Sequence, residues 1–152
     1  MYGFVVLFPQ KIVINQLAPT MKASLQFSTR DEFYRIPISR IVFFVADKNY
    51  TVMQLSNGKT LLFTFSLQKM HDYIISTMGE ELASRVFSRV GRSHIINLSF
   101  VYHIDMIKQR LVLYAEHEAL EYIVPVSKDA LRTLRALLER PATKLEITNE
   151  KK

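Results

Sequence analysis

The segment from Phe87 to Val101, F-S-R-V-G-R-S-H-I-I-N-L-S-F-V, holds the side chains best suited to chemistry in this chain. Two arginines, Arg89 and Arg92, stand among apolar, strand-like residues, and the segment contains no acidic residue to neutralise them. Ser93 and Asn97 follow. Guanidinium groups pair with phosphates and guanine edges, and serine and asparagine side chains donate to phosphate oxygens. The pattern presents positive charge rather than burying it, which predicts contact with an anionic partner.

The composition limits the fold and the partner. The chain has 152 residues, 49% of them hydrophobic, so it can bury one good core but hardly two, and we expect one domain with short extensions. A net charge of +6 favours an anionic partner, although charge alone does not separate nucleic acid, a membrane surface and an ordinary basic domain. The absence of cysteine excludes disulfides and thiolate sites and is compatible with a reducing cytoplasm.

Catalytic alternatives lack their sequence signatures. Ser93, His94 and Asp105 are the residue types of a hydrolase triad, but no nucleophile elbow surrounds the serine, and adjacent side chains on a strand point to opposite faces. The four glycines form no phosphate-binding loop, and the four histidines are too scattered for a metal site. We therefore expect no enzyme activity, no cofactor, no metal and no small-molecule substrate.

Residues 1–22 differ in character from the rest of the chain. The apolar run at 2–8 is too short to span a membrane, and no basic residue precedes it as in a secretory signal. We interpret residues 1–22 as an arm that packs on the domain or on a second copy; a remnant of a longer upstream region is the alternative. We expect no membrane segment, a cytoplasmic location and no receiver domain on this chain.

Short runs rich in Phe, Tyr, Val and Ile predict a series of β-strands after the arm. Those runs cover residues 25–27, 33–38, 41–46, 50–55, 59–65, 101–107, 111–115 and 120–126. The Asn57-Gly58 pair predicts a two-residue type I′ turn, because both of its positions need positive φ, and so a hairpin over 50–65. The last three runs predict a meander.

Two stretches have helical periodicity. In the first, Ser66 can cap the N-terminus and Gly79 can end the helix, which leaves Glu80 and Glu81 in a solvated turn. In the second, Ser127 is the expected N-cap. The expected buried stripe of that helix consists of Leu131, Leu134 and Leu138. The predicted fold class is thus mainly β with two helices, α+β, over residues 23–140, followed by a polar tail at 141–152.

The central segment resembles the signature of LytTR-type DNA-binding domains. In that signature a phenylalanine, an arginine, a His-Arg-Ser triplet and an Ile/Val-Asn pair follow one another in this order. Gly91 stands where the family usually has histidine. The positions that match are Phe87, Arg89, Arg92, Ser93, Ile96 and Asn97.

Three flanking stretches are similar to the same family, so that the resemblance covers about residues 25–138. The loop at 45–50 fits the family's strand end followed by a Gly/Asn-Tyr pair, although an ordinary connecting loop is the alternative. The helix opened by Ser66 fits as well. Residues 123–130 resemble the closing Pro-Val-Ser-Arg segment, with Lys128 in place of arginine.

The resemblance implies an elongated, mostly antiparallel β-domain that reads double-stranded DNA with inter-strand loops and regulates transcription as a response-regulator output domain. A homodimer on repeated half-sites is compatible with it. Arg89 is expected to contact phosphate or to brace the loop. The DNA-binding residues that the resemblance implies are Lys48, Asn49, Tyr50, Arg89, Arg92, Ser93 and Lys128.

Two positions in this pattern lead to alternatives. Asn97 is expected to bond backbone at a bend rather than to touch DNA, as asparagine commonly does in turns. Gly91 and Lys128 replace an imidazole and a fork-shaped donor, which weakens base-specific readout and leaves phosphate affinity. The alternative function is therefore a LytTR-like module used for protein–protein interaction or regulation, with only non-specific DNA affinity.

Overall fold

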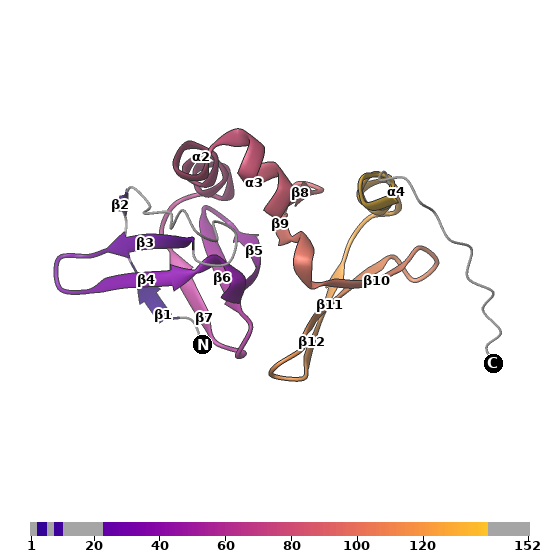
Figure 1. The fold of residues 1–152 in the computed structure, drawn as a ribbon, viewed down its shortest axis with the longest axis horizontal. Helices are drawn as coiled ribbons and strands as arrows, with labels where there is room; N and C mark the ends of the chain where they lie inside the picture. Colours follow the sequence, from indigo (N-terminus) through magenta and orange to yellow (C-terminus); the bar gives the residue numbers. More distant parts are fainter. Residues whose placement is uncertain (1–2, 6–7, 11–22, 140–152) are drawn as a thin grey trace.

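The computed structural model describes residues 3–5, 8–10 and 23–139, which form an elongated, mostly antiparallel β structure (Figure 1). The elements up to the central segment are β1 (Gly3–Val5), β2 (Phe8–Gln10), β3 (Ser24–Ser28), β4 (Phe33–Pro37), the short 3-10 helix η1 (Ile38–Arg40), β5 (Ile41–Asp47), β6 (Tyr50–Leu55), β7 (Thr60–Phe63), α2 (Leu67–Met78) and α3 (Glu80–Val86). The remaining elements are β8 (Phe87–Val90), β9 (His94–Asn97), η2 (Leu98–Phe100), β10 (Val101–Asp105), β11 (Arg110–Ala115), β12 (Leu120–Pro125) and α4 (Lys128–Glu139). The mainly β fold class is confirmed.

The strands form three sheets. The largest has the order β1-β7-β6-β5-β9-β8 and is antiparallel apart from the β1–β7 pair. A second sheet joins β2, β3 and β4, and β10, β11 and β12 form the expected meander. Of the arm expected at residues 1–22, only β1 and β2 are described, and they pair with β7 and β3. The rest of that arm and the tail expected at 141–152 lie outside the described residues.

The buried side chains form two clusters, where the composition predicts one core. The first core lies among β3, β5–β7, α2 and α3; the second lies among β8, β9, the meander and α4. Adjacent residues of β5 and β9 face opposite ways: Phe44 and Ile95 belong to the first core, whereas Phe43 packs against the second core and Ile96 belongs to it. Side chains alternate between the two faces of a strand. The sequence of a strand that is buried on both faces is therefore a continuous apolar run.

The first predicted helix has its expected limits, but a third helix follows it. Ser66 caps α2 by accepting a hydrogen bond from the Lys69 N–H at 3.1 Å, and Gly79 ends the helix at a φ of 87°. The sequence predicts that Glu80 and Glu81 lie in a solvated turn. They lie instead in the first turn of α3. Carboxylates are favourable there because the N-terminal end of a helix carries partial positive charge.

The buried face of α4 is rotated relative to the predicted stripe. Leu131 and Leu134 are buried as expected, but Leu138 is 38% exposed. Leu137 and Ala130, one heptad apart, pack against the second core instead. The helix therefore turns the Ala130 side toward the sheet, which leaves Leu138 at the border of the apolar face. None of the helices in the described residues is long and apolar enough to cross a membrane.

The hairpin of β6 and β7 is confirmed, but its turn is longer than predicted. Only Gly58 has a positive φ, 93°, whereas a type I′ turn needs Asn57 to have one as well. The Asn57 side chain instead accepts a hydrogen bond from the Lys59 N–H at 3.0 Å, and Leu55 N–H donates to the Lys59 carbonyl at 2.9 Å. The asparagine thus shapes a four-residue loop with its side chain rather than with its φ.

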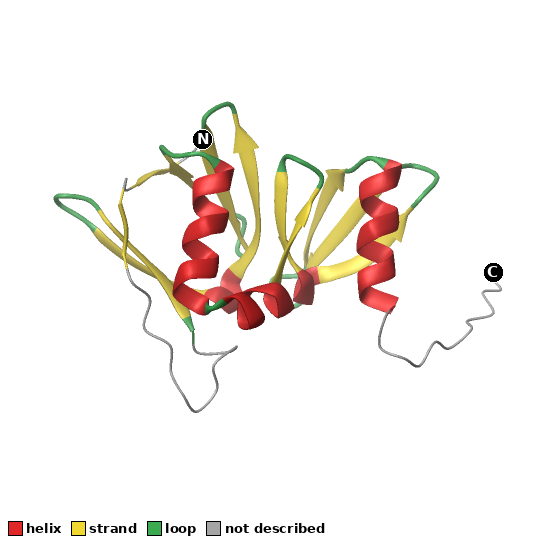
Figure 2. Ribbon diagram, turned by 90° about the horizontal axis from the view of Figure 1, so that it is seen from above, coloured by secondary structure: helices red, strands yellow, loops and turns green. Residues whose placement is uncertain are grey.

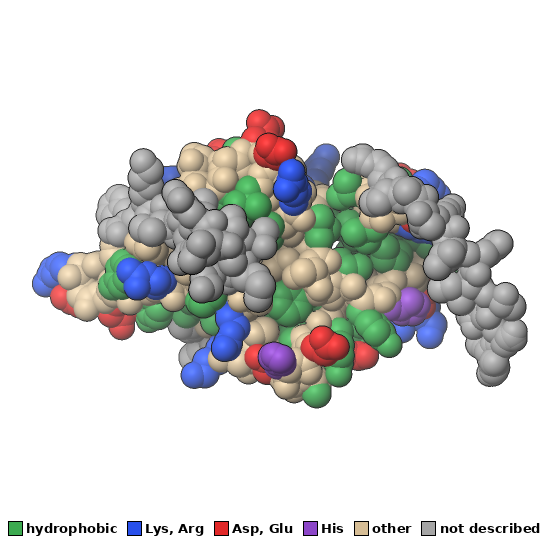
Figure 3. Space-filling model, in the orientation of Figure 1, with side chains coloured by type: hydrophobic (Ala, Val, Ile, Leu, Met, Phe, Trp, Pro, Cys, Tyr) green, Lys and Arg blue, Asp and Glu red, His purple; other side chains and the backbone are tan. Residues whose placement is uncertain are grey.

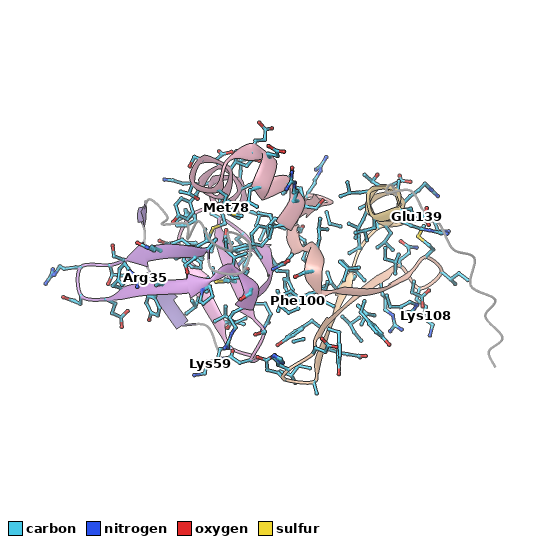
Figure 4. The ribbon with its side chains drawn as sticks, viewed as in Figure 1. Arg35, Lys59, Met78, Phe100, Lys108 and Glu139 are labelled. Carbon is cyan, nitrogen blue, oxygen red and sulfur yellow. The ribbon has the colours of Figure 1, made fainter. Side chains whose placement is uncertain are left out.

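The meander is tied to the first hairpin at this loop. The Tyr122 hydroxyl lies 3.0 Å from the Leu55 carbonyl oxygen and 3.1 Å from that of Ser56. The Ser56 hydroxyl donates to the Glu118 carboxylate at 3.1 Å. These residues form the far tie, named for its place at the end of β6 opposite Tyr50. Together with Phe100, labelled between the two halves in Figure 4, the far tie makes the two cores parts of one unit.

Candidate nucleic-acid interface

The turn between β5 and β6 presents the first three predicted residues. Asp47 and Tyr50 close the strand ladder, which leaves Lys48 and Asn49 at the tip of a two-residue turn. Both tip side chains are exposed, and Tyr50 is 46% exposed. Lys48, rather than Asn49, takes the positive φ of 61°. A non-glycine residue there is unfavourable by roughly 1 kcal/mol or more, and such positions concentrate at functional sites.

The turn between β8 and β9 presents Arg92 and Ser93, both exposed. Gly91 begins this turn with a φ of 66°, which glycine adopts without steric cost. The Ser93 carbonyl accepts a hydrogen bond from the Ala46 N–H at 2.8 Å, continuing the pairing of β9 with β5. Since Ala46 lies two residues before Lys48, the second predicted loop lies beside the first.

Arg89 holds the second turn in place. Its guanidinium donates to the Arg92 carbonyl at 3.2 Å and to the Gln68 side chain on α2 at 3.1 Å, while its Nε has no partner among the described residues. These contacts favour the brace over the phosphate contact, both of which the sequence left open. Gln68 was not predicted, because nothing in its local sequence marks a contact with a residue 21 positions away.

The start of α4 presents Lys128 next to the second turn. Ser127 caps the helix as expected, its hydroxyl accepting from the Ala130 N–H at 3.2 Å. A Cβ at Gly91 would lie 3.8 Å from the Ala130 Cβ, and a cavity of about 380 Å³ between β8 and α4 is lined by both residues. A lysine in the first turn opposes the helix dipole, so Lys128 is not placed for helix stability. An ammonium beside free backbone N–H groups suits a phosphate instead.

The two turns and the helix start form one surface, the loop edge, defined by Lys48, Tyr50, Arg92, Ser93 and Lys128. Figure 2 shows inter-strand loops and the ends of two long helices along its upper side. Within the described part of the chain, the three cations of this edge form no ion pair.

Two carboxylates lie next to the loop edge, and one of them is neutralised. Asp129, which follows Lys128, pairs with Arg132 at 2.8 Å. Asp47 flanks the first turn and is half-buried. The cations of the edge therefore outnumber the free carboxylates beside it, and their charge is available to an external anion.

Asn97 lies below the edge and is 2% exposed. Its amide donates to the Ile38 carbonyl at 3.2 Å and to the Ile41 carbonyl at 2.8 Å, and its oxygen accepts from the Ser99 N–H and hydroxyl at 3.1 and 2.9 Å. These contacts support the expected structural role, because every polar atom of the side chain is used within the fold.

His94 follows Ser93 and is half-buried, with its ring 6.0 Å from that of Phe43 in an edge-on contact. Burial lowers its pKa below the ordinary value, because the charged form loses hydration. Burial also lowers the pKa of His71 on α2, helped by the charge of Arg89 and opposed by Asp72. Among the described residues, no three His, Asp or Glu side chains group where they could hold a metal ion.

Comparison with known proteins identifies the family. The model of the LytTr DNA-binding domain matches residues 31–139. Among solved structures, the LytTr DNA-binding domain of a Bacillus cereus protein described as a methyl-accepting/DNA response regulator has a TM-score of 0.55 at 23% identity, over 77% of this chain and 97% of that one, a likeness that shows the fold. No curated protein matches the chain. Because the family match spans most of the chain and includes the whole loop edge, the chain belongs to the LytTR family, whose domains bind DNA in transcription regulation.

Proposed function

We propose that this chain recognises specific duplex sequences with the loop edge and acts as a transcriptional regulator in the cytoplasm, with residues 23–140 as its DNA-binding domain. One observation supports this most directly: three cations from three separate elements share one edge and lack ion pairs within the described residues. Exposed like charges cost stability when brought together, and a polyanion offsets that cost.

The residues of the loop edge have different parts in this proposal. Arg92 can donate two parallel hydrogen bonds to a guanine edge, so it carries most of the base discrimination. Lys128 is a flexible point charge and meets a phosphate, as does Ser93. Tyr50 packs its ring against a sugar or a thymine methyl, and Lys48 and Asn49 contact the adjacent backbone. Arg89 positions the second turn.

Salt dependence tests DNA binding through charge. Fluorescence anisotropy of a labelled duplex is measured from about 50 to 200 mM salt, and log affinity should fall linearly with a slope of about −0.9 for each phosphate neutralised. We expect a slope that corresponds to several contacts. A flat response contradicts the proposal.

Substitutions on the loop edge test sequence recognition. Arg92→Ala should weaken binding to the preferred site by about 1–3 kcal/mol and narrow the gap to scrambled duplex. Lys128→Ala should weaken both duplexes about equally and lower the salt slope by roughly one contact. Arg30→Ala is the matched control, because Arg30 is exposed on the distant β3–β4 turn.

The same measurements address the alternative function. If binding falls with salt but Arg92→Ala leaves the ratio of the two affinities unchanged, the second turn does not read sequence. That outcome supports a module with only non-specific DNA affinity. Tyr50→Phe separates two further contacts: a mild effect indicates ring packing, and a large one indicates that the hydroxyl is bonded.

A further inference from the structure

The meander has one face turned away from the second core. In the β10–β11–β12 ladder Leu111 and Leu113 point into that core, so the alternate residues of β11 point outward. Directly paired residues share a face, and the Tyr102 ring lies 5.6 Å from that of Tyr114. The outer face is defined by Tyr102, His103, Asp105, Arg110, Val112, Tyr114, Glu121 and Ile123.

The centre of the outer face is largely apolar, and its exposed residues surround one buried valine. Tyr102 is 68% exposed and Ile123 is 51% exposed. Val112 itself is 7% exposed; it pairs directly with Ile123 and with the exposed His103, and it lies between Arg110 and Tyr114 along β11. Contiguous exposed aromatic and aliphatic side chains on a small domain mark interaction surfaces, and tyrosine is enriched among the residues that carry binding energy. In Figure 3 hydrophobic side chains also show between the places that α4 and β10 have in Figure 1, on the side of the meander that faces the second core.

The two ends of the outer face carry opposite charge. Arg110 lies at the β10–β11 end, near Lys108, which Figure 4 labels. Asp105 is directly paired with Arg110 on β10, and its carboxylate accepts a hydrogen bond from the Lys108 N–H at 3.0 Å, so the positive charge of this end comes from two cations and one carboxylate. The other end has Glu121 beside the β11–β12 turn.

The charged groups at the two ends differ in whether they are already paired. Glu116 is exposed on the β11–β12 turn, whereas Glu118 is held by Ser56 at 3.1 Å. Within the described residues, Arg110 forms no ion pair and its buried Nε has no hydrogen-bond partner. The Arg110 side chain is half-buried, and its unpaired charge can be met by a carboxylate of another chain.

We propose that the outer face binds the outer face of a second copy of this chain around a two-fold axis near Val112. Glu121 pairs with Tyr114 and Arg110 with Pro125, so the Val112–Ile123 pair lies midway between the two charges. A two-fold rotation exchanges the ends, bringing Arg110 of each copy to Glu121 of the partner subunit while the apolar centres meet. Self-complementary charge of this kind suits a two-fold interface.

DNA is a poorer occupant of this face, because Glu121 and Glu116 repel phosphate. Self-association through the outer face does not rest on the proposed DNA recognition, since it needs no residue of the loop edge. Where the two copies bind one duplex, they would engage repeated half-sites.

Sedimentation of the full chain without DNA, over a wide concentration range, tests the apolar centre. We expect a reversible monomer–dimer equilibrium. Ile123→Asp should weaken it by at least about tenfold, since a buried unpaired carboxylate opposes association. Ile107→Asp is the matched control, because Ile107 is 89% exposed at the turn beyond the face and should leave the equilibrium unchanged. Circular dichroism confirms that each variant is folded.

Charge reversal tests the two-fold arrangement. Arg110→Glu and Glu121→Arg should each weaken self-association by roughly tenfold, because each places like charges together at both ends of the interface. A mixture of the two variants should dimerise again, since each copy then offers the opposite charge to the other. A structural defect would not be rescued by mixing.

Three results overturn the proposal. The first is a chain that stays monomeric at every concentration. The second is a dimer that Ile123→Asp leaves intact, since the copies then meet elsewhere. The third is loss of DNA affinity in Arg110→Glu with self-association unchanged, which assigns Arg110 to the DNA interface.

Discussion

The first core and the second core share the central strands but differ in size and in kind. The first buries five phenylalanines and a tyrosine together with apolar residues along α2 and with Ala83 of α3, whereas the second consists of nine aliphatic side chains from Val42 to Leu134. In the first core the rings of Phe27 and Phe63 lie 4.6 Å apart. Aromatic side chains each bury about 150–250 Å², so the first core contributes the larger share of the hydrophobic stabilisation.

The residues of the loop edge are held in place by different cores. The first turn of the loop edge, with Lys48, belongs to strands of the larger core. Lys128 belongs to α4, which the smaller core holds. Arg92 lies in the turn between β8 and β9, two strands that contribute to both cores. A change in either core should therefore reach the loop edge through the strands that the two cores share.

The largest effect is expected in the first core. Phe44 is fully buried, with its ring 5.8 Å from that of Phe87. Phe44→Ala should lower the free energy of unfolding in urea by about 3–5 kcal/mol, because it leaves a cavity among side chains that cannot close around it. Phe33→Ala is the control, since Phe33 is an exposed ring on β4. Equal losses for the two variants contradict the dominance of the first core.

The second core should respond less. Leu131→Ala should cost toward the lower end of about 2–5 kcal/mol, because a small aliphatic cluster at the end of the molecule relaxes more easily. Leu138→Ala should cost less than about 0.5 kcal/mol, as surface substitutions do. If urea unfolding gives the two variants the same loss, the stripe that the sequence predicts is right, and α4 is not rotated as described.

The junction of the two cores can be tested at Asn97, which ties β9 to the backbone of η1 and β5. Asn97→Ala should cost about 1–3 kcal/mol, because it leaves buried carbonyl groups unpaired. DNA affinity of the folded protein should persist. An unchanged thermal unfolding curve together with lost DNA binding would falsify the structural role and assign Asn97 to the interface.

The smallest change in the free energy of unfolding is expected when the pH is lowered. It tests the junction of the two cores at a second residue, His94. The pKa of His94 is lowered in the folded state, so below about pH 6.5 the unfolded chain binds more protons than the folded one. Stability should fall as the pH drops through 6.5 toward the lowered pKa and then level off. His94→Phe, which keeps a ring beside Phe43, should flatten this dependence in urea unfolding at pH 7.5 and 5.5. The exposed His117→Gln is the control, and His71 leaves a residual slope.

Local patterns predicted the local features well. The caps at Ser66 and Ser127 and the end at Gly79 follow from side-chain and φ preferences of single residues, and the strands follow from apolar runs. The meander and the hydrogen bonds of Asn97 to the backbone were also predicted from local sequence. The loop-edge residues came from the family resemblance, and their roles in DNA binding stay predictions.

Features set by contacts between distant segments were not predictable from one sequence. The rotation of α4 depends on how Ala130 meets Gly91, and the brace of Arg89 depends on Gln68 from another element. The chain has two cores because β5 and β9 are covered on both faces. An apolar run such as Val42 to Val45 is compatible with burial on both faces, but it does not identify the elements that cover the strand. Helix α3 was missed because a glycine that ends one helix can also precede the next.

The far tie has a consequence for the shape of the bound duplex. Tyr122 and Glu118 fasten the meander to the loop at Leu55 and Ser56, so a hinge between the halves would have to break three half-buried hydrogen bonds. The spacing between Tyr50 and Lys128 is then set before DNA arrives, and we expect the DNA to bend to meet it. Base pairs between the contacted ones would influence affinity through their flexibility alone. Affinities for sites with stiff A-tracts or flexible TA steps at those positions measure this, and equal values would show that the protein adjusts instead.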